Sequence, residues 1–431
     1  MTVSCFAFMI PIYAQKTWTL DQCIKYAWEN NIQLKKQDLQ TESSKTSFKQ
    51  SQIALLPDLY AGGSYGWNLG RSVNPYTNEF SNNVANASIY MQSTLVLFNG
   101  MQQIHTIAQN KTLLEKSFKD YAKAKNDLGL QIATIYLQIL FNDENLNVAQ
   151  KQQDMSHLQS EKMIRLVEVG NKSKGDLLLM QAQEANDKYN VITAKNNLSI
   201  SYLTLAQLLE LKNSDDFKIQ IPDSLKIEND KTLSSVDEIY KAAESILPQV
   251  KSAELDLRSS EQGLLVTKGQ YSPQLNLVGA YGSGYTDQNP SGFWSQISDN
   301  DHKSLTFNLN IPIFTKYQTK SRISFAHIKV LDSQYTLELT RKSLYKEIQS
   351  AHADAVGALE KYYAAIEAVR SNEEAVKYSQ QKFDVGMLSA VDYNTAKNNL
   401  TKANSDLIQS KYTYVFKLKI LDFYKGLPIV L

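Results

Sequence analysis

Residues 58–70, which read DLYAGGSYGWNLG, alternate strictly between two kinds of side chain. A repeat of two residues is the period of a β-strand, whose successive side chains point to opposite faces. The sequence therefore predicts a strand over 58–70 with one apolar face and one face of small or polar residues. The apolar face comprises Leu59, Ala61, Gly63, Tyr65, Trp67 and Leu69.

Three further segments, 85–98, 273–286 and 303–314, show the same alternation. Each is ~10 to 13 residues long, the length that a tilted strand needs to cross a bilayer. Tyr65, Trp67, Tyr281 and Tyr285 are candidates for the aromatic residues at the membrane interface. Alternation alone also fits a half-buried soluble sheet, which is the commoner structure. The choice between a soluble sheet and a membrane-spanning one therefore depends on the rest of the chain.

An internal repeat relates the two halves of the chain at a constant offset of 216 residues, without a gap. Pro57 coincides with Pro273, Tyr65-Gly66 with Tyr281-Gly282, and Val169-Gly170 with Val385-Gly386. A fixed period of this kind indicates a duplicated structural unit. We expect one copy at 15–230 and a second at 231–431, which leaves no room for an added catalytic domain.

Helical patterns fill the space between the strands. Residues 100–169 contain no proline and only one internal glycine, Gly129, and predict a helix of about 100 Å at 1.5 Å per residue. Apolar residues recur along it at steps of four and three, as in a coiled coil. The second copy predicts an equivalent helix at 315–385, and shorter helices are expected at 19–56, 173–211, 235–271 and 389–425.

The turns between long and short helices have the sequence Val-Gly-x-x-Ser-x-x-Asp in both copies. Gly170 and Gly386 suit the left-handed position that ends a helix. Ser173 and Ser389 can cap the next helix, while Asp176 and Asp392 can reach back to complete a capping box. Both turns are expected to be tight helical tips, and a purely structural role explains the serines and aspartates about as well as a functional one.

Composition excludes several classes of function. The net charge of the 431-residue chain is +1, which does not favour nucleic-acid binding. The two cysteines and five histidines form no pattern typical of a metal site or a catalytic centre, and no phosphate-binding loop is present. We expect no enzymatic activity, no cofactor and no metal.

The first fourteen residues form an apolar segment before Gln15, as in a secretory signal peptide, although a basic start is missing. A buried N-terminal strand is the alternative interpretation. Cys5 is a weak candidate for lipidation, because the residues before it lack the expected leucine.

The chain resembles the TolC family of outer-membrane efflux proteins over about residues 17–426. The motifs that carry the resemblance are the two Val-Gly-x-x-Ser-x-x-Asp tips, Leu97-Phe-Asn-Gly100, Asn310-Ile-Pro-Ile-Phe314, Pro57-Asp-Leu and Pro273-Gln-Leu. The resemblance implies an α+β membrane protein whose homotrimer forms a 12-stranded outer-membrane β-barrel, four strands from each protomer, above a periplasmic α-barrel of coiled-coil hairpins. The residues agree, because four strands are too few to close a barrel and lipid tolerates no open sheet edge.

The resemblance also implies a function as a passive exit duct of a tripartite efflux pump or type I secretion system. Its partners would be a periplasmic adaptor protein, an inner-membrane pump of the RND or ABC type, and outer-membrane lipid. Residues matching the adaptor-docking tips are Val169, Gly170, Ser173, Asp176, Val385, Gly386 and Ser389.

Asp392 matches a position that constricts the periplasmic entrance in this family. Thr395 and Leu388 depart from the acidic and basic residues often found beside it, and Lys172 is the candidate for the missing cation. Two alternatives to the exit duct remain. One is a soluble periplasmic coiled-coil adaptor or scaffold, and the other is an enzyme on a helical frame. The sequence does not distinguish drugs, metals and proteins as cargo.

Overall fold

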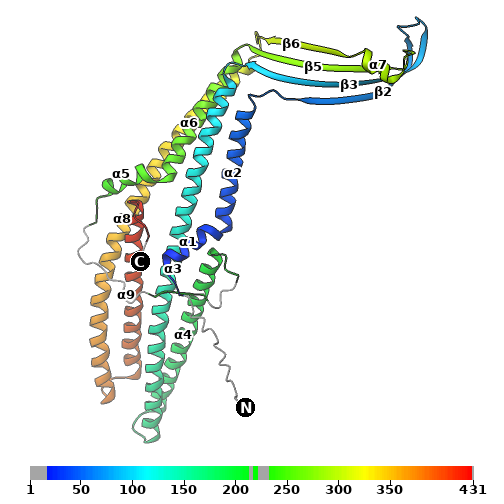
Figure 1. The fold of residues 1–431 in the computed structure, drawn as a ribbon. Helices are drawn as coiled ribbons and strands as arrows, with labels where there is room; N and C mark the ends of the chain where they lie inside the picture. Colours follow the sequence, from blue (N-terminus) through cyan, green and yellow to red (C-terminus); the bar gives the residue numbers. More distant parts are fainter. Residues whose placement is uncertain (1–16, 213–216, 222–232, 430–431) are drawn as a thin grey trace, which may run out of the picture. The chain divides into compact units, whose positions relative to one another are not determined.

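Four antiparallel strands form one sheet in the order β2–β3–β5–β6 (Figure 1). Their bounds are Tyr60–Val73 for β2, Phe80–Phe98 for β3, Gln274–Thr286 for β5 and His302–Asn310 for β6. The coordinates are those of a computed structural model that describes residues 17–212, 217–221 and 233–429. The expected signal peptide at 1–14 and Cys5 lie outside these ranges.

The described residues divide into two units, which are considered separately. The sheet unit lies within Leu39–Lys119 and Lys251–Leu339, and the helical unit lies within Met1–Asp38, Asp120–Val250 and Thr340–Leu431. Both long helices run through both units.

The register of the sheet keeps the alternating apolar residues on one face. Leu277 of β5 is paired with Leu95 of β3 and Phe307 of β6. On β2, Tyr65 is paired with Ala87, which is in turn paired with Tyr285. The resulting apolar face is exposed in the single chain.

Two strand ends differ from the sequence prediction. The first hairpin is longer than expected because Val73 pairs with Phe80, whose ring also lies 3.7 Å from the Arg71 guanidinium carbon. The prediction that the last strand reaches 314 was wrong: β6 ends at Asn310. Pro312 follows, and proline has no N–H to donate to a strand ladder.

A short helix, α7 (Phe293–Asp299), lies between β5 and β6 and was not predicted. In Figure 1 it lies at the end of the strands that is far from the helices of the sheet unit.

The internal repeat is visible in the helices. The long helices α3 (Gln102–Glu168) and α8 (Gln318–Asp384) each have 67 residues. The helices that follow them, α4 (Lys174–Leu208) and α9 (Ala390–Tyr424), each have 35. Corresponding helices begin at residues separated by the same offset as the sequence motifs.

The predictions of single helices over 19–56 and 235–271 were wrong, because each is broken near its start. The first copy has α1 (Leu20–Asn30) and α2 (Ile32–Ile53), separated by Asn31 in an extended conformation. The Asn31 side-chain oxygen accepts from the N–H groups of Gln33 and Leu34, at 2.9 and 3.2 Å, and so caps the second helix.

In the second copy, α5 (Val236–Ile246) and α6 (Pro248–Lys268) meet at Leu247. Leu247 is extended because the proline after it disfavours helical geometry, whereas proline itself suits the first position of a helix. A single 3₁₀ turn, Gly269–Tyr271, follows α6 before β5.

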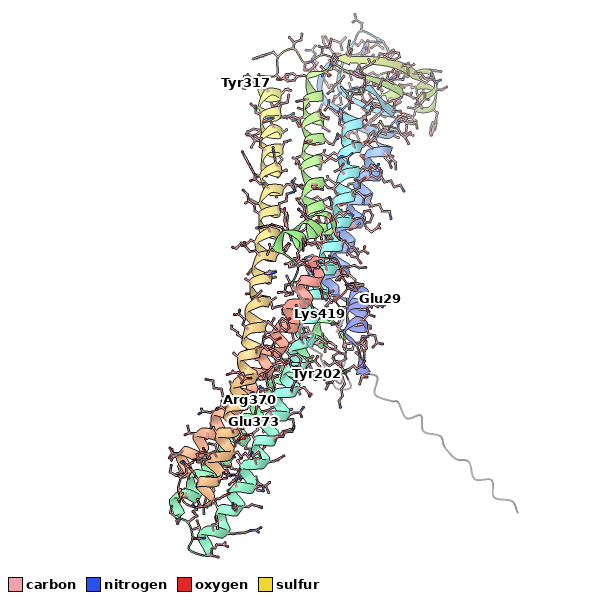
Figure 2. All side chains as sticks on the ribbon, turned by 90° about the vertical axis from the view of Figure 1, so that its left-hand side faces the viewer. Glu29, Tyr202, Tyr317, Arg370, Glu373 and Lys419 are labelled. Atoms are coloured by element: carbon pink, nitrogen blue, oxygen red, sulfur yellow. The ribbon has the colours of Figure 1, made fainter. Side chains whose placement is uncertain are left out.

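The core of the helical unit packs around α3. Ile132, Ile139 and Leu140 are buried there against Cys23 of α1 and Leu205 of α4. Arg370 and Glu373 are examples of the polar side chains that project from α8 (Figure 2).

Two very short strands, β1 (Thr17–Trp18) and β4 (Lys218–Ile219), pair in parallel beside this core. The Tyr136 hydroxyl donates to the Gln220 carbonyl oxygen at 2.6 Å, which ties the pair to α3. The sequence did not predict this pairing. None of the helices in the described ranges combines the length and the apolar composition that a membrane span requires.

Candidate functional site: two helical tips

Each long helix is followed, two residues after its end, by a glycine with a positive φ, as the sequence predicts. Gly170 has φ +76° and Gly386 has φ +80°. The Asn171 N–H donates to the Leu166 carbonyl at 2.8 Å and the Gly170 N–H to the Val167 carbonyl at 3.0 Å, which satisfies the last carbonyls of α3. The second tip repeats both hydrogen bonds, so the two turns have the same geometry.

The serine caps of α4 and α9 are also equivalent. Ser173 Oγ accepts from the Asp176 N–H and Ser389 Oγ from the Asp392 N–H, both at 3.1 Å. The expectation that the aspartates reach back to the cap backbone was wrong. Each carboxylate instead accepts from its serine hydroxyl, at 2.8 Å for Asp176 and 2.7 Å for Asp392.

Complete capping boxes lie elsewhere, at Thr19 with Gln22 and at Ser235 with Glu238. Asp176 and Asp392 remain well placed for the positive ends of the α4 and α9 dipoles.

The two tips contact each other through polar groups. Lys172 Nζ, on the first tip, donates to the Phe383 carbonyl oxygen at 3.2 Å and lies 4.6 Å from the centre of the Phe383 ring. Lys162 Nζ of α3 forms an ion pair with Asp384 of α8 at 2.8 Å. These contacts join the end region of α3 and the turn that follows it to the last turn of α8, which is distant in sequence.

A small apolar cluster lies beneath these polar contacts. The Phe383 and Tyr393 rings stack with centres 5.0 Å apart and an interplanar angle of 6°, and Met163, Met180 and Ala390 complete the buried cluster. Burial, followed by the charge of Asp384, raises the pKa of Tyr393, which keeps the phenol neutral.

The Tyr393 hydroxyl accepts from Gln159 Nε2 of α3 at 3.2 Å. The tips are therefore held together by a stacked aromatic pair, in which the hydroxyl group of Tyr393 has a hydrogen-bond partner.

The predicted entrance residues are not in one cluster. Asp392 is exposed at the start of α9, and Lys172 lies in the contact between the two tips, half-buried on Phe383. The structure does not bring Lys172 and Asp392 into an ion pair. Val169 and Val385, at the very ends of the tips, are 75% and 71% exposed, so both turns present an apolar residue to the outside of the chain.

A buried polar layer lies further along the helices, and sequence reasoning missed it. Asp187 of α4 is buried and accepts from Gln183 Nε2 at 3.0 Å and from Gln152 Nε2 at 3.3 Å. Lys397 of α9 is also buried, which lowers its pKa against the opposing effect of Asp187. Lys397 follows Tyr393 by one helical turn, and this spacing was the available signal that a lysine lies on the buried face.

The four predicted interfacial aromatics lie on the apolar face of the sheet. Tyr65, Trp67 and Tyr285 are near the end of β5 at which α7 lies, whereas Tyr281 is four residues further from that end than Tyr285. The Tyr65 and Trp67 rings are in contact with centres 4.9 Å apart, and Tyr285 contacts Phe293 of α7 with centres 5.1 Å apart. Tyr281 lies beside Lys303, whose Nζ is 5.7 Å from the ring centre.

No group of three or more histidine, cysteine or acidic side chains in the described part of the chain is arranged to hold a metal ion.

Comparison with known proteins decides the family. The family described as "Outer membrane efflux protein" matches residues 23–210 and again residues 239–425, one match for each copy of the repeat. The chain belongs to this family. A member of the family acts in the outer membrane in efflux, which favours the duct over the soluble scaffold as the interpretation of this sequence.

Relatives and solved structures agree with the family. The chain is 24% identical to the outer membrane protein TolC of Vibrio cholerae over 402 residues, covering 93% of this chain and 88% of the relative. It has the fold of the Campylobacter jejuni CmeC outer membrane channel, with a TM-score of 0.80, 18% identity, and coverage of 94% and 85%. The open state of the Neisseria gonorrhoeae MtrE outer membrane channel is similar, with a TM-score of 0.76, 18% identity, and coverage of 95% and 88%.

Proposed function

We propose that three copies of this chain form the passive exit duct of a tripartite export assembly, without catalysis and without a cofactor. The observation that carries the proposal is the open sheet. β2 and β6 lie at its two edges, and side chains on its apolar face such as Leu305 are 69% exposed. Unpaired strand edges cannot be accommodated in lipid, so the edges have to pair with those of other copies.

Three copies would supply twelve strands with an apolar outer face, as the family resemblance implies. The alternation then assigns the opposite face, which carries Gly62, Gly66, Gly282 and Asn308, to the lumen. The aromatic residues Tyr65, Trp67, Tyr281 and Tyr285 would lie at the membrane interface.

We assign the two tips to the docking of a periplasmic adaptor protein, which would connect the duct to an inner-membrane pump. The exposed Val169 and Val385 would provide apolar contacts, with Gly170 and Gly386 allowing close approach. Ser173, Asp176 and Ser389 shape the start of the next helix through the caps described above.

The entrance constriction would combine Asp392 with Lys172 in different roles. A ring of three Asp392 carboxylates would favour cations at the entrance. Lys172 would act through the contact between the tips, because its ammonium group is already held by Phe383.

Membrane fractionation followed by detergent extraction and measurement of the native mass tests the assembly. We expect a trimer in the outer membrane, and a soluble monomer or dimer would refute the proposal.

Single-channel recording of Asp392→Asn tests the entrance. Asp176→Asn is the matched control, because its hydrogen bond to the capping serine has nearly the same length. We expect reduced preference for cations in Asp392→Asn only. If selectivity does not change, Asp392 does not form the constriction.

A further inference from the structure

The short helix α7 is firmly built onto the sheet. Gln296 is buried; its Nε2 donates to the carbonyl oxygens of Thr286, Asn289 and Ser291, and its Oε1 accepts from the Thr286 N–H. The Ser291 contact is the shortest, at 2.6 Å. One side chain thus binds the backbone at the end of β5 and at two positions of the loop that follows, so α7 has a defined position on β5.

The position of α7 is on the apolar face of the sheet. Ser283 Oγ donates to the Ile297 carbonyl oxygen at 2.6 Å, and the Tyr285 ring contacts Phe293. Ser283 and Tyr285 have the same parity along β5 as Leu277, and the pairing with β3 is regular between them. α7 therefore lies on the same side of the sheet as the side chains assigned to lipid.

α7 itself has two different edges. Phe293 and Trp294 form an aromatic edge, with ring centres 5.2 Å apart, and Trp294 is 80% exposed. On the other edge Ser295 Oγ donates to the Asp299 carboxylate at 3.0 Å. A short helix with an aromatic edge and a polar edge suits the boundary between lipid and water, where tryptophan is enriched.

The height of α7 along the strands agrees with this boundary. The apolar face of β5 begins at Leu275, and ten residues separate it from Tyr285. At ~3.4 Å per residue and a tilt of ~40°, this corresponds to about 26 Å across the membrane, close to the ~25 Å apolar band of outer-membrane barrels.

The only lysine of β6, Lys303, pairs its ammonium group with Asp301 at 3.2 Å, and Asp301 lies just before β6 at the end of the sheet near α7. The ion pair lies on the side of Lys303 that faces α7, which is the direction in which a lysine near a membrane surface extends its charge.

We propose that α7 is an interfacial anchor, with Phe293 and Trp294 embedded in the headgroup region of the outer leaflet. The inference rests on the lipid-facing role proposed for the apolar face, with which the aromatic edge of α7 is continuous. The partner is the lipid surface, and the anchor fixes the depth of the far end of the sheet in the membrane.

The test uses the full chain in phospholipid vesicles with an environment-sensitive fluorophore on single cysteines at Trp294→Cys, Ser295→Cys and Leu305→Cys. Unsubstituted protein measures the labelling background of the two native cysteines, of which Cys23 is buried and Cys5 lies in the segment expected to be removed as a signal peptide. Lipids with a nitroxide at the headgroup or deep in the acyl chain, and iodide in water, serve as quenchers.

We expect the headgroup nitroxide to quench the probe at 294 about threefold more than the probe at 295, and the deep nitroxide to quench the probe at 305 most. Access of iodide to 294 equal to that at 295 would overturn the anchor. Protection of 294 from every quencher would show that a neighbouring protein covers it, which also overturns the anchor.

If neither nitroxide quenches the probe at 305, the sheet face is not in lipid and the proposed function fails. Should a labelled variant not assemble, brominated lipid provides a second test through intrinsic tryptophan fluorescence. Trp294→Phe is then expected to remove part of the quenching seen in the unsubstituted protein, and unchanged quenching refutes the anchor.

Discussion

Replacement of Gly100 by alanine is expected to destabilise the junction between β3 and α3. Gly100 has φ +66° and lies against Gly269 of the turn that follows α6. A Cβ at Gly100 would lie 2.4 Å from the Gly269 carbonyl oxygen and 2.5 Å from Ser272 Cβ. A Cβ at Gly269 would likewise lie 2.5 Å from the Gly100 carbonyl oxygen, so each glycine occupies the space that the other would need.

The expected cost has two parts. A left-handed conformation costs a residue with a Cβ about 1–2 kcal/mol. The overlap adds about 1–3 kcal/mol, because the nearest atom belongs to the backbone and the two connections have to move apart. The total for Gly100→Ala is therefore about 2–5 kcal/mol.

Two controls separate these parts. Gly170 has φ +76° but nothing within 4 Å of an added Cβ, so Gly170→Ala should show only the conformational cost. Gly357 lies within α8 with equally open space and no positive φ, so Gly357→Ala should be neutral or stabilising, by up to about 1 kcal/mol.

The assay is the loss of helical circular dichroism on heating detergent-solubilised protein, compared as unfolding half-times because large proteins often unfold irreversibly. Gly100→Ala should unfold fastest, then Gly170→Ala, then Gly357→Ala. Equal half-times for Gly100→Ala and Gly170→Ala would refute the argument from close approach.

Two further predictions concern the tips and the helices that lead to them. Lys172→Met removes the ammonium group that binds Phe383 and should raise the open probability of single channels. The control Lys174→Met, at an exposed position, should leave the open probability unchanged. Equal effects of the two variants would rule out a specific role for the contact between Lys172 and Phe383. His157 donates to the Glu184 carboxylate at 2.7 Å, and this hydrogen bond and charge raise the pKa of His157 and lower that of Glu184. The stabilisation from His157 is complete below its unfolded pKa and is lost as the pH rises through the raised folded pKa, so the advantage of the unsubstituted protein over His157→Gln in thermal unfolding should be larger at about pH 6 than at about pH 9. An advantage independent of pH would show that the ion pair does not contribute.

Features that depend on local chemistry could be predicted from the sequence. The two tips follow from Gly170 and Gly386 at positions that require a positive φ, together with a serine three residues later. The strand faces follow from strict alternation, as between Leu277 and Tyr285. The face on which each side chain lies depends only on its position along the strand and not on contacts with distant segments. The repeat itself needs only the comparison of the chain with itself.

Features that depend on contacts between distant segments could not be predicted. Asn31 ends a helix because its side chain caps the next one, which the helical pattern around it conceals. Lys172 was assigned to the entrance from its place on the tip, but its ammonium group binds Phe383, 211 residues away in sequence. α7 is held by Gln296, whose hydrogen bonds go to the backbone of the last residue of β5 and of the following loop, and that loop has no periodic pattern.

The two copies of the repeat have the same structure at the tips, where both are proposed to dock the same partner. They differ at the far end of the sheet, where only the second copy carries the proposed anchor. The tips have matching turns and caps, as expected if six similar hairpins line one entrance in a trimer. At the far end of the sheet the first hairpin closes with a turn in which Asn74 Oδ1 accepts from the Tyr76 N–H at 2.8 Å, whereas the second carries α7. Asn74 Nδ2 also donates to the Gln288 carbonyl oxygen at 3.1 Å, so the loop of the first hairpin is fastened to the one that precedes α7. One anchor in each protomer can therefore hold both hairpins, and the first copy does not need a helix of its own.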